Sequence, residues 1–302
     1  MKFKIAVIII GAIVLLSGCT TQNKNSESTS DTDSLKWYSY TDGMNEVNKT
    51  GKPAMLFFCT FNNNSESYSQ SFCKLVEDEL FSNDTVKSML KKFILIKVEV
   101  YDQSQEWILS KYRFVYTPFP LVIFLNSKGK ELSRLVAYGI YDPSDKNTSI
   151  ERFIEVLNLT LKGKVKGEDF RFVTLSGKEK HLSEYRNKVV VLDLMSVNCP
   201  ACRKEMEYLS QVKDHYMNDN TVVIISIDVA KDAADSIKAV YGDYIGKWTF
   251  GMDKYGEASK YLLENAIPTI VVIDELGRIF YLRAGALPAQ NLIELIENVK
   301  GN

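Results

Sequence analysis

The stretch VVVLDLMSVNCPAC, from Val189 to Cys202, decides the fold of this 302-residue chain. Its first seven residues are an apolar run with one acid, Asp193, which is typical of a buried strand. Two cysteines separated by two residues follow, and an amphipathic pattern continues to Met217. The sequence therefore predicts a strand and then a helix that begins at the thiols of Cys199 and Cys202.

This position gives the two thiols their chemistry. Two cysteines at a helix start are near enough to form a disulfide with little rearrangement. The unpaired N–H groups and partial positive charge of a helix N-terminus favour a thiolate. Cysteines in such motifs commonly have pKa values of roughly 3.5 to 7.5. Pro200 suits the first helical turn, where its missing N–H costs nothing. The motif indicates a redox-active dithiol.

Residues from about Val165 to Val299 resemble the TlpA/ResA branch of the thioredoxin superfamily, which are extracytoplasmic thiol–disulfide oxidoreductases. The matching pieces are the Asp169-Phe170 lead-in, the Cys-Pro-Ala-Cys motif and Ile267-Pro268-Thr269. The resemblance implies that Cys199 is the exposed nucleophile and that Cys202 resolves the mixed disulfide.

The resemblance implies roles for three more residues. Pro268 would follow a cis peptide bond beside the active site, and the main chain of Ile267 would pair with a bound substrate strand. In thioredoxin a buried carboxylate at the place of Asp193 assists proton transfer to and from the second cysteine, and burial would raise its pKa. The alternative is a solvated Asp193 at a sheet edge. Asn198 stands where the family usually has tryptophan, which removes an aromatic surface beside the site.

Other functions of the motif fit less well. A structural zinc site usually needs four ligands, and the sequence has no second Cys-x-x-Cys. A copper chaperone would need a histidine beside the thiolates, and nothing in the spacing of His181 or His215 argues for one. Ser196, three residues before Cys199, suggests a peroxidase, but the upstream proline of peroxiredoxins is missing. A structural disulfide remains the plain alternative.

The pattern around Pro268 occurs a second time. Pro120 and Pro268 each begin an apolar run, and glycine follows each after nine residues, at Gly129 and Gly277. Upstream, both copies have strand–helix–strand patterns, which imply parallel pairing, whereas the strand–turn–strand near each end implies an antiparallel edge. The sequence predicts an α/β protein of two tandem thioredoxin-like folds, each a mixed sheet flanked by helices. The expected elements include strands 54–59, 93–100, 132–137, 189–195, 222–228 and 279–283, helices 65–80, 149–161, 199–217 and 288–299, and a hairpin of 170–175 with 180–182, followed by a helical turn that Ser183 caps.

The first copy lacks the dithiol. The positions that correspond to Cys199 and Cys202 fall near Asn63 and Glu66. Phe57 takes the place of Asp193, although Pro120 remains as the expected cis-proline. These losses agree, so we expect a redox-inactive domain that binds a partner or acts as a spacer.

Two further cysteines of the first copy have no assigned role. Cys59, at a strand end, and Cys73, in a helix, could form a disulfide or remain small buried thiols. A bond between a strand end and the middle of a helix needs particular Cβ geometry, which favours unpaired thiols. Aromatic side chains could line a partner-binding groove of this domain, although some of them would belong to the core: Trp37, Tyr38, Tyr40 and Tyr68.

The N-terminus resembles a bacterial-type lipoprotein signal. Two lysines precede a 12-residue apolar run, too short for a spanning helix of about 20 residues. The run ends Leu16-Ser17-Gly18-Cys19, which resembles a lipobox, so cleavage would leave Cys19 carrying a diacylglyceryl group. An uncleaved signal is the alternative. Residues 20–34 contain no apolar side chain and form a predicted tether, with a reach of about 50 Å when extended.

Composition supports this organisation. The chain is 45% apolar, which excludes a disordered protein, and five cysteines leave at least one unpaired within the chain. Without residues 1–18 it carries 35 basic and 38 acidic residues, so a nucleic-acid partner is not expected. The predicted parts are a signal peptide (1–18), lipidated Cys19 and tether (19–34), a redox-inactive thioredoxin-like domain (35–162) and a TlpA/ResA-like domain (166–302).

The sequence thus predicts a membrane-anchored thiol–disulfide oxidoreductase of the cell envelope, which reduces protein disulfides through Cys199 and Cys202. No cofactor beyond this disulfide and no metal is expected. The partners would be cysteine-containing extracytoplasmic proteins, a membrane thiol electron donor and the membrane itself. The alternative is a non-enzymatic, partner-binding lipoprotein whose Cys199–Cys202 disulfide is structural.

Overall fold

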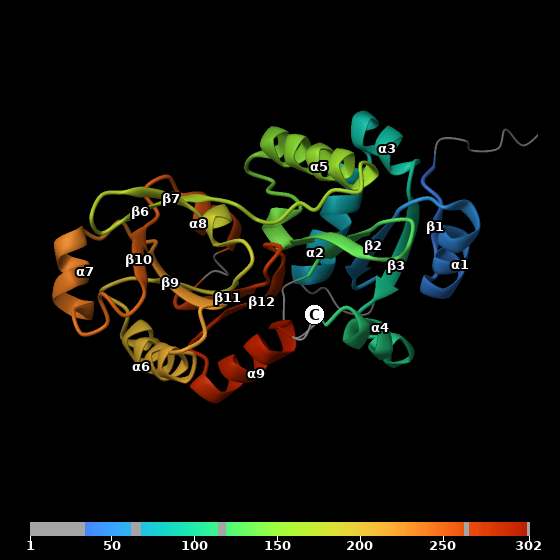
Figure 1. Ribbon diagram of the computed structural model, residues 1–302. Helices are drawn as coiled ribbons and strands as arrows, with labels where there is room; N and C mark the ends of the chain where they lie inside the picture. Colours follow the sequence, from blue (N-terminus) through green and yellow to red (C-terminus); the bar gives the residue numbers. More distant parts are fainter. Residues whose placement is uncertain (1–33, 62–67, 114–118, 263–265, 301–302) are drawn as a thin grey trace, which may run out of the picture. The chain divides into compact units, whose positions relative to one another are not determined.

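Two mixed sheets flanked by helices make up the described part of the chain, as predicted (Figure 1). The structure is a computed structural model and describes residues 34–61, 68–113, 119–262 and 266–300. Within these ranges, no helix has the length and apolar character needed to cross a membrane.

The first sheet has five strands in the order β1-β3-β2-β4-β5. Its central strand β2 is parallel to β3 and antiparallel to β4, and every residue of β2 and β4 is buried. The predicted strands are present; the short strand β1 was not predicted. The strands are β1 (Trp37–Tyr38), β2 (Ala54–Cys59), β3 (Ile94–Glu99), β4 (Leu121–Leu125) and β5 (Glu131–Val136).

Helices cover this sheet on both faces. Helix α1 was not predicted; Ser39 caps its start by accepting a hydrogen bond from the Asp42 N–H (3.2 Å), and Gly51 ends it with a φ of 65°. The helix expected over 65–80 is described from Tyr68 and continues as a π-helical segment to Phe81. The helices are α1 (Tyr40–Thr50), α2 (Tyr68–Leu75), the π-helix (Val76–Phe81), α3 (Asp84–Leu90), α4 (Glu106–Lys111) and α5 (Lys146–Leu161).

The second sheet has seven strands in the order β12-β11-β8-β9-β10-β6-β7. The apolar strand β8 lies between β11, which is antiparallel to it, and β9, which is parallel. The elements are β6 (Arg171–Thr174), β7 (Glu179–His181), β8 (Val189–Met195), α6 (Pro200–His215), β9 (Val222–Asp228), α7 (Ala234–Tyr241), β10 (Thr249–Met252), α8 (Glu257–Leu262), β11 (Thr269–Ile273), β12 (Ile279–Ala284) and α9 (Ala289–Lys300).

The hairpin predicted before β8 is present as β6 and β7, but the prediction for Ser183 is wrong. The short 3-10 helix (Leu182–Tyr185) begins two residues earlier than predicted, with His181 at its cap position, and the His181 N–H donates to Glu184 (2.8 Å). Ser183 lies inside the turn, and its N–H and hydroxyl donate to Asp169 instead (2.8 and 2.9 Å).

The two sheets share a core of four strands with the same order and directions. Both Phe119–Pro120 and Ile267–Pro268 are cis peptide bonds, as expected. Two residues after each proline, Val122 pairs with Phe57 and Ile270 pairs with Asp193. The predicted correspondence of Phe57 and Asp193 is therefore confirmed by strand register.

The expectation of unpaired thiols in the first sheet is wrong. Cys59 and Cys73 form a disulfide, with Cα atoms 6.0 Å apart, because α2 packs over the end of β2 and brings both buried cysteines into bonding range. Of the aromatic residues considered for a groove, Tyr40 belongs to the core and Trp37 is half-buried. Trp37 packs at 5.9 Å from the rings of Phe57 and of Phe81, and Tyr40 is buried. Tyr38 is half-buried, while Cys19, Asn63, Glu66 and the side chain of Tyr68 lie outside the described residues.

Candidate active site

The two cysteines of the Cys-Pro-Ala-Cys motif form a disulfide at the start of α6. Their Cα atoms are 5.2 Å apart, and the Cys202 N–H, one of the unpaired donors of the first turn, points at the Cys199 sulfur (3.0 Å). Cys199 is 8% exposed, whereas Cys202 is fully buried. Once the bond is reduced, the helix N-terminus favours a thiolate on Cys199, the sulfur that solvent can reach.

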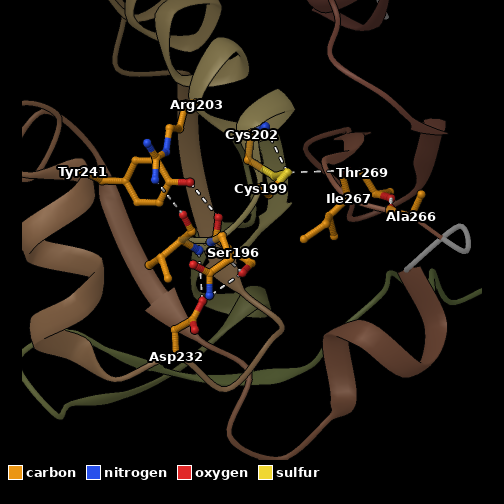
Figure 2. The surroundings of a disulfide bond; sticks show 11 residues. Ser196, Cys199, Cys202, Arg203, Asp232, Tyr241, Ala266, Ile267 and Thr269 are labelled. Atoms are coloured by element: carbon orange, nitrogen blue, oxygen red, sulfur yellow. Dashed lines mark hydrogen bonds between the residues drawn. A yellow bond between two sulfur atoms is a disulfide. The ribbon is translucent and has the colours of Figure 1, made fainter.

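The cis-proline segment lies beside this disulfide (Figure 2). The Cys199 sulfur is 3.6 Å from the carbonyl oxygen of Ile267, which can accept a hydrogen bond from a thiol when the pair is reduced. The strand pairing of β11 begins at Thr269, so the main chain of Ile267 precedes the sheet. Ile267 is half-buried and Ala266 is exposed. The backbone next to the sulfur is thus accessible.

The turn before Cys199 is held by side chains from three elements (Figure 2). Asp232 accepts hydrogen bonds from the hydroxyl of Ser196 and the N–H of Val197, both at 2.9 Å. The Tyr241 hydroxyl donates to the Ser196 carbonyl (2.7 Å), and Arg203 donates to the Val197 carbonyl (3.3 Å). These contacts fix the backbone that presents the first cysteine.

Asp193 is fully buried in the centre of the sheet, so the alternative of a solvated sheet-edge residue is wrong. Neither carboxylate oxygen has a hydrogen-bond partner among the described residues. Burial raises the pKa of Asp193 to about 7, and the neighbouring Ser226 side chain acts in the opposite direction. Ser226 accepts a hydrogen bond from the indole N–H of Trp248 (3.0 Å).

Glu205 is a second buried acid that the sequence analysis missed. It lies on α6, fully buried, and one oxygen accepts the Leu287 N–H (2.7 Å). Burial first, and then the charge of Asp193, raise the pKa of Glu205 to about 8. The spacing in the sequence could have indicated it, because a residue three positions after Cys202 lies on the same face of the helix as Cys202. Burial therefore raises the pKa of both acids toward neutral pH, and for Glu205 the charge of Asp193 adds to the effect.

Comparison with known proteins covers this half of the chain. The Redoxin family matches residues 162–296. The thiol–disulfide oxidoreductase ResA of Bacillus thuringiensis subsp. konkukian is 28% identical over 131 residues, which are 43% of this chain and 75% of that protein. ResA of Geobacillus thermodenitrificans is 23% identical over 133 residues, 44% of this chain and 75% of its own. Residues 162–296 are a ResA-like redoxin domain.

Solved structures similar to part of this chain include StoA from Bacillus subtilis. The match has 19% identity and a TM-score of 0.37, and it covers 43% of this chain and 96% of that chain. The exposed lipoprotein thioredoxin Etrx1 of Streptococcus pneumoniae has 19% identity, 43% of this chain, 99% of that chain and a TM-score of 0.38. The first sheet lies before the residues that the Redoxin family matches.

The two histidines of the redoxin domain contact residues other than the two cysteines of the active-site disulfide. His181 lies 3.6 Å from a carboxylate oxygen of Asp169, and His215, at the end of α6, packs edge-on against Tyr216. Across the described ranges, no group of three or more histidine, cysteine or acidic side chains is placed to hold a metal ion.

Proposed function

We propose that the redoxin domain reduces disulfides of extracytoplasmic proteins, while Cys19 anchors the chain to a membrane through lipid. The observation that carries the proposal is the asymmetry of the pair at the start of α6. Cys199 is partly accessible and Cys202 is fully buried. Cys199 is therefore the attacking sulfur, and Cys202 can react only within the protein.

The proposed reaction has two exchanges. The Cys199 thiolate attacks one sulfur of a substrate disulfide; a mixed disulfide forms, the substrate bond breaks, and the other substrate sulfur leaves as a thiolate that takes up a proton. The Cys202 thiolate then attacks the Cys199 sulfur and releases the second substrate thiolate. Two electrons pass to the substrate, and a membrane thiol electron donor restores the dithiol by the same exchange.

Asp193 and Glu205 supply the proton acceptor for the second step. Cys202 must lose its proton while it is enclosed by protein, and burial holds the pKa of Asp193 at about 7. An acid with a pKa near the working pH can take the proton from a thiol and return it later. The neighbouring Glu205, with a pKa raised to about 8, accepts or supplies the proton that Asp193 exchanges.

The substrate would lie along the cis-proline segment. An extended peptide can pair with free main-chain groups beside a sheet, which gives affinity with little demand on side chains. The main chain of Ile267 lies next to the Cys199 sulfur and precedes the paired part of β11, and Pro268 keeps a bulky side chain away from the sulfur. The proposed substrates are therefore proteins with accessible disulfides.

Support for the location is the N-terminal sequence. The short apolar run and the Leu-Ser-Gly-Cys sequence ending at Cys19 favour a lipid anchor, followed by a polar tether. The domain of residues 35–162 would be a redox-inactive module that binds a partner or sets a distance.

Insulin reduction with the full chain tests the exchange. Cys199→Ser should abolish activity, because no attacking sulfur remains, whereas Cys202→Ser should accumulate mixed disulfides that resist release. Circular dichroism provides the control for folding. Wild-type activity in both variants would overturn the proposal. Capture with Cys202→Ser in native membranes, followed by mass spectrometry, identifies the substrates.

A further inference from the structure

Seven exposed lysines gather at one end of the first sheet. The N-terminal ends of β1, β2, β3 and β5 meet the C-terminal end of β4 there, since β4 is antiparallel to its neighbours. Helices α1 and α3 also end there, because each leads into β2 or β3. We call this surface the basic end: Lys36, Lys49, Lys52, Lys91, Lys92, Lys128 and Lys130.

Few acids balance this charge. The segments that form the basic end (36, 49–53, 91–93 and 126–131) contain one acid, Glu131, which is bonded to Arg134 at 2.9 Å. Lys49 lies 3.9 Å from Glu46 on α1, yet its side chain is 78% exposed. Five neighbouring strands span about 20 Å, so the lysines form a dense positive surface.

The matching ends of the four shared strands are neutral in the second sheet. The segments beside them (186–188, 219–221 and 274–278) hold three basic and three acidic residues. Arg278 is bonded to Asp274 at 2.6 Å, and Asp219 to Lys300 at 2.5 Å. Because the two sheets share their core topology, the strand ends themselves do not require lysine. Along these shared strands, the excess of lysine belongs to the first copy.

The chain also enters the fold at the basic end. Trp37 pairs with Leu95 in parallel strands, so the same register places Leu35 beside Phe93, which follows Lys92 and directly precedes β3. The predicted tether and Cys19 directly precede Leu35 in sequence. A lipid on Cys19 would therefore hold this fold near the membrane through a tether that joins the fold at its basic end.

We propose that the basic end lies on anionic lipid headgroups. This proposal depends on the proposed lipid anchor at Cys19. Lysines within a Debye length of an anionic surface are attracted to it, and an acyl anchor combined with a basic patch binds more firmly than either one. The anchor keeps the first fold close to the membrane, and the lysines determine its orientation there. The basic end contacts the headgroups, and the cis-Pro120 end is directed away from the lipid.

Amine footprinting of the full, lipid-modified chain tests this orientation. The chain is placed in vesicles of phosphatidylcholine, or of equal parts phosphatidylcholine and phosphatidylglycerol, and acetylation of each lysine is followed by mass spectrometry. Anionic vesicles should slow acetylation of the basic-end lysines by about threefold or more. The exposed lysines of the second fold, Lys178, Lys247 and Lys254, serve as internal controls. Salt at 1 M, where the Debye length is about 3 Å, should remove the protection.

Charge variants sharpen the result. Lys52→Gln/Lys92→Gln/Lys128→Gln/Lys130→Gln should abolish protection of the remaining basic-end lysines, whereas Lys178→Gln/Lys238→Gln/Lys247→Gln/Lys254→Gln should not. Equal acetylation on both vesicles would overturn the surface while leaving the anchor in place. A chain that fails to float with either vesicle would overturn the anchor, and the surface proposal with it. Protection by inorganic phosphate alone would show an anion site rather than a membrane surface, and would also overturn it.

Discussion

An informative difference between the two folds lies at one row of paired residues across the sheet, which we call the rung. In the second fold this rung places Asp193 between Ile270 and Ser226. In the first fold the same positions hold Phe57 between Val122 and Lys97. Over the four shared strands, strand order and direction are the same in both folds, and so is the cis-proline. One scaffold thus accepts either an acid or an aromatic ring at its centre.

The side chains around the rung also differ between the two folds. Phe57 lies in an aromatic cluster with Trp37, Phe61 and Phe81, at ring distances of 5.1 to 5.9 Å. The Lys97 ammonium lies 5.0 Å from the Trp37 ring and pairs with Glu77 at 2.8 Å. Asp193, in contrast, has no hydrogen-bond partner in the described part of the chain. A buried, unpartnered acid costs stability, so its presence in the second fold points to chemistry rather than folding.

The largest effect should come from the disulfide of the first fold. Cys59→Ala/Cys73→Ala should lower the local unfolding free energy by about 3 kcal/mol, since the bond closes a 15-residue loop in the unfolded chain. Hydrogen exchange of peptides from β2 and β3 measures this loss. Cys199→Ala/Cys202→Ala, which opens a shorter loop, should cost less when measured in β8 and β9. Equal protection in the first variant and wild type would show that the Cys59–Cys73 bond does not hold that fold together.

Sequence patterns predicted the two sheets because each strand is a buried apolar run, and equal proline-to-glycine spacing revealed the repeat. They missed α1, whose start depends on a cap at Ser39 rather than on apolar periodicity. The Cys59–Cys73 bond was missed because it depends on how a helix packs over a strand end. Glu205 was missed because a charged residue in a helix is usually solvated. Its burial depends on the tertiary structure, in which the segment before α9 lies against it and the Leu287 N–H donates to its carboxylate.

A second prediction concerns the acid that the first fold lacks. Asp193→Asn should slow the resolution of mixed disulfides by about a hundredfold near pH 7, because Cys202 loses its proton acceptor. Stopped-flow measurement of mixed-disulfide decay over a pH series tests this. The slowing should be specific to the second exchange, so attack by Cys199 should change little. Asp235→Asn, at a fully solvated position of α7, is the matched control. An unchanged pH profile would exclude Asp193 as the acceptor.

Stability gives an independent readout of Asp193. Its pKa is raised from 3.8 to about 7 in the folded protein. The folded state therefore holds a proton that the unfolded state has already released, and stability falls as pH rises from about 4 to about 7. This fall follows from proton linkage at one buried carboxyl group. Asp193→Asn should flatten this fall in hydrogen exchange of β8. A fall of the same size in the variant would assign it to another group.

The smallest effect should come from a contact that both folds keep. In the second fold the Val197 N–H donates to Asp232 (2.9 Å), and in the first fold the N–H at the matching position, Phe61, donates to Glu99 (2.6 Å). Because the contact persists where the dithiol is lost, it positions the turn rather than performing the exchange.

Asp232→Asn should therefore lower the rate of attack by Cys199 by only about fivefold, the equivalent of roughly 1 kcal/mol for one weakened hydrogen bond. The variant should act on the first exchange and leave the pH profile of the second unchanged, which separates positioning from proton transfer. Glu99→Gln weakens the matching contact in the first fold and should leave insulin reduction at the wild-type rate. A loss of a hundredfold or more in Asp232→Asn, with an altered pH profile, would instead place Asp232 among the groups that exchange protons. The retained contact would then have acquired chemistry in the second fold that the first fold never needed.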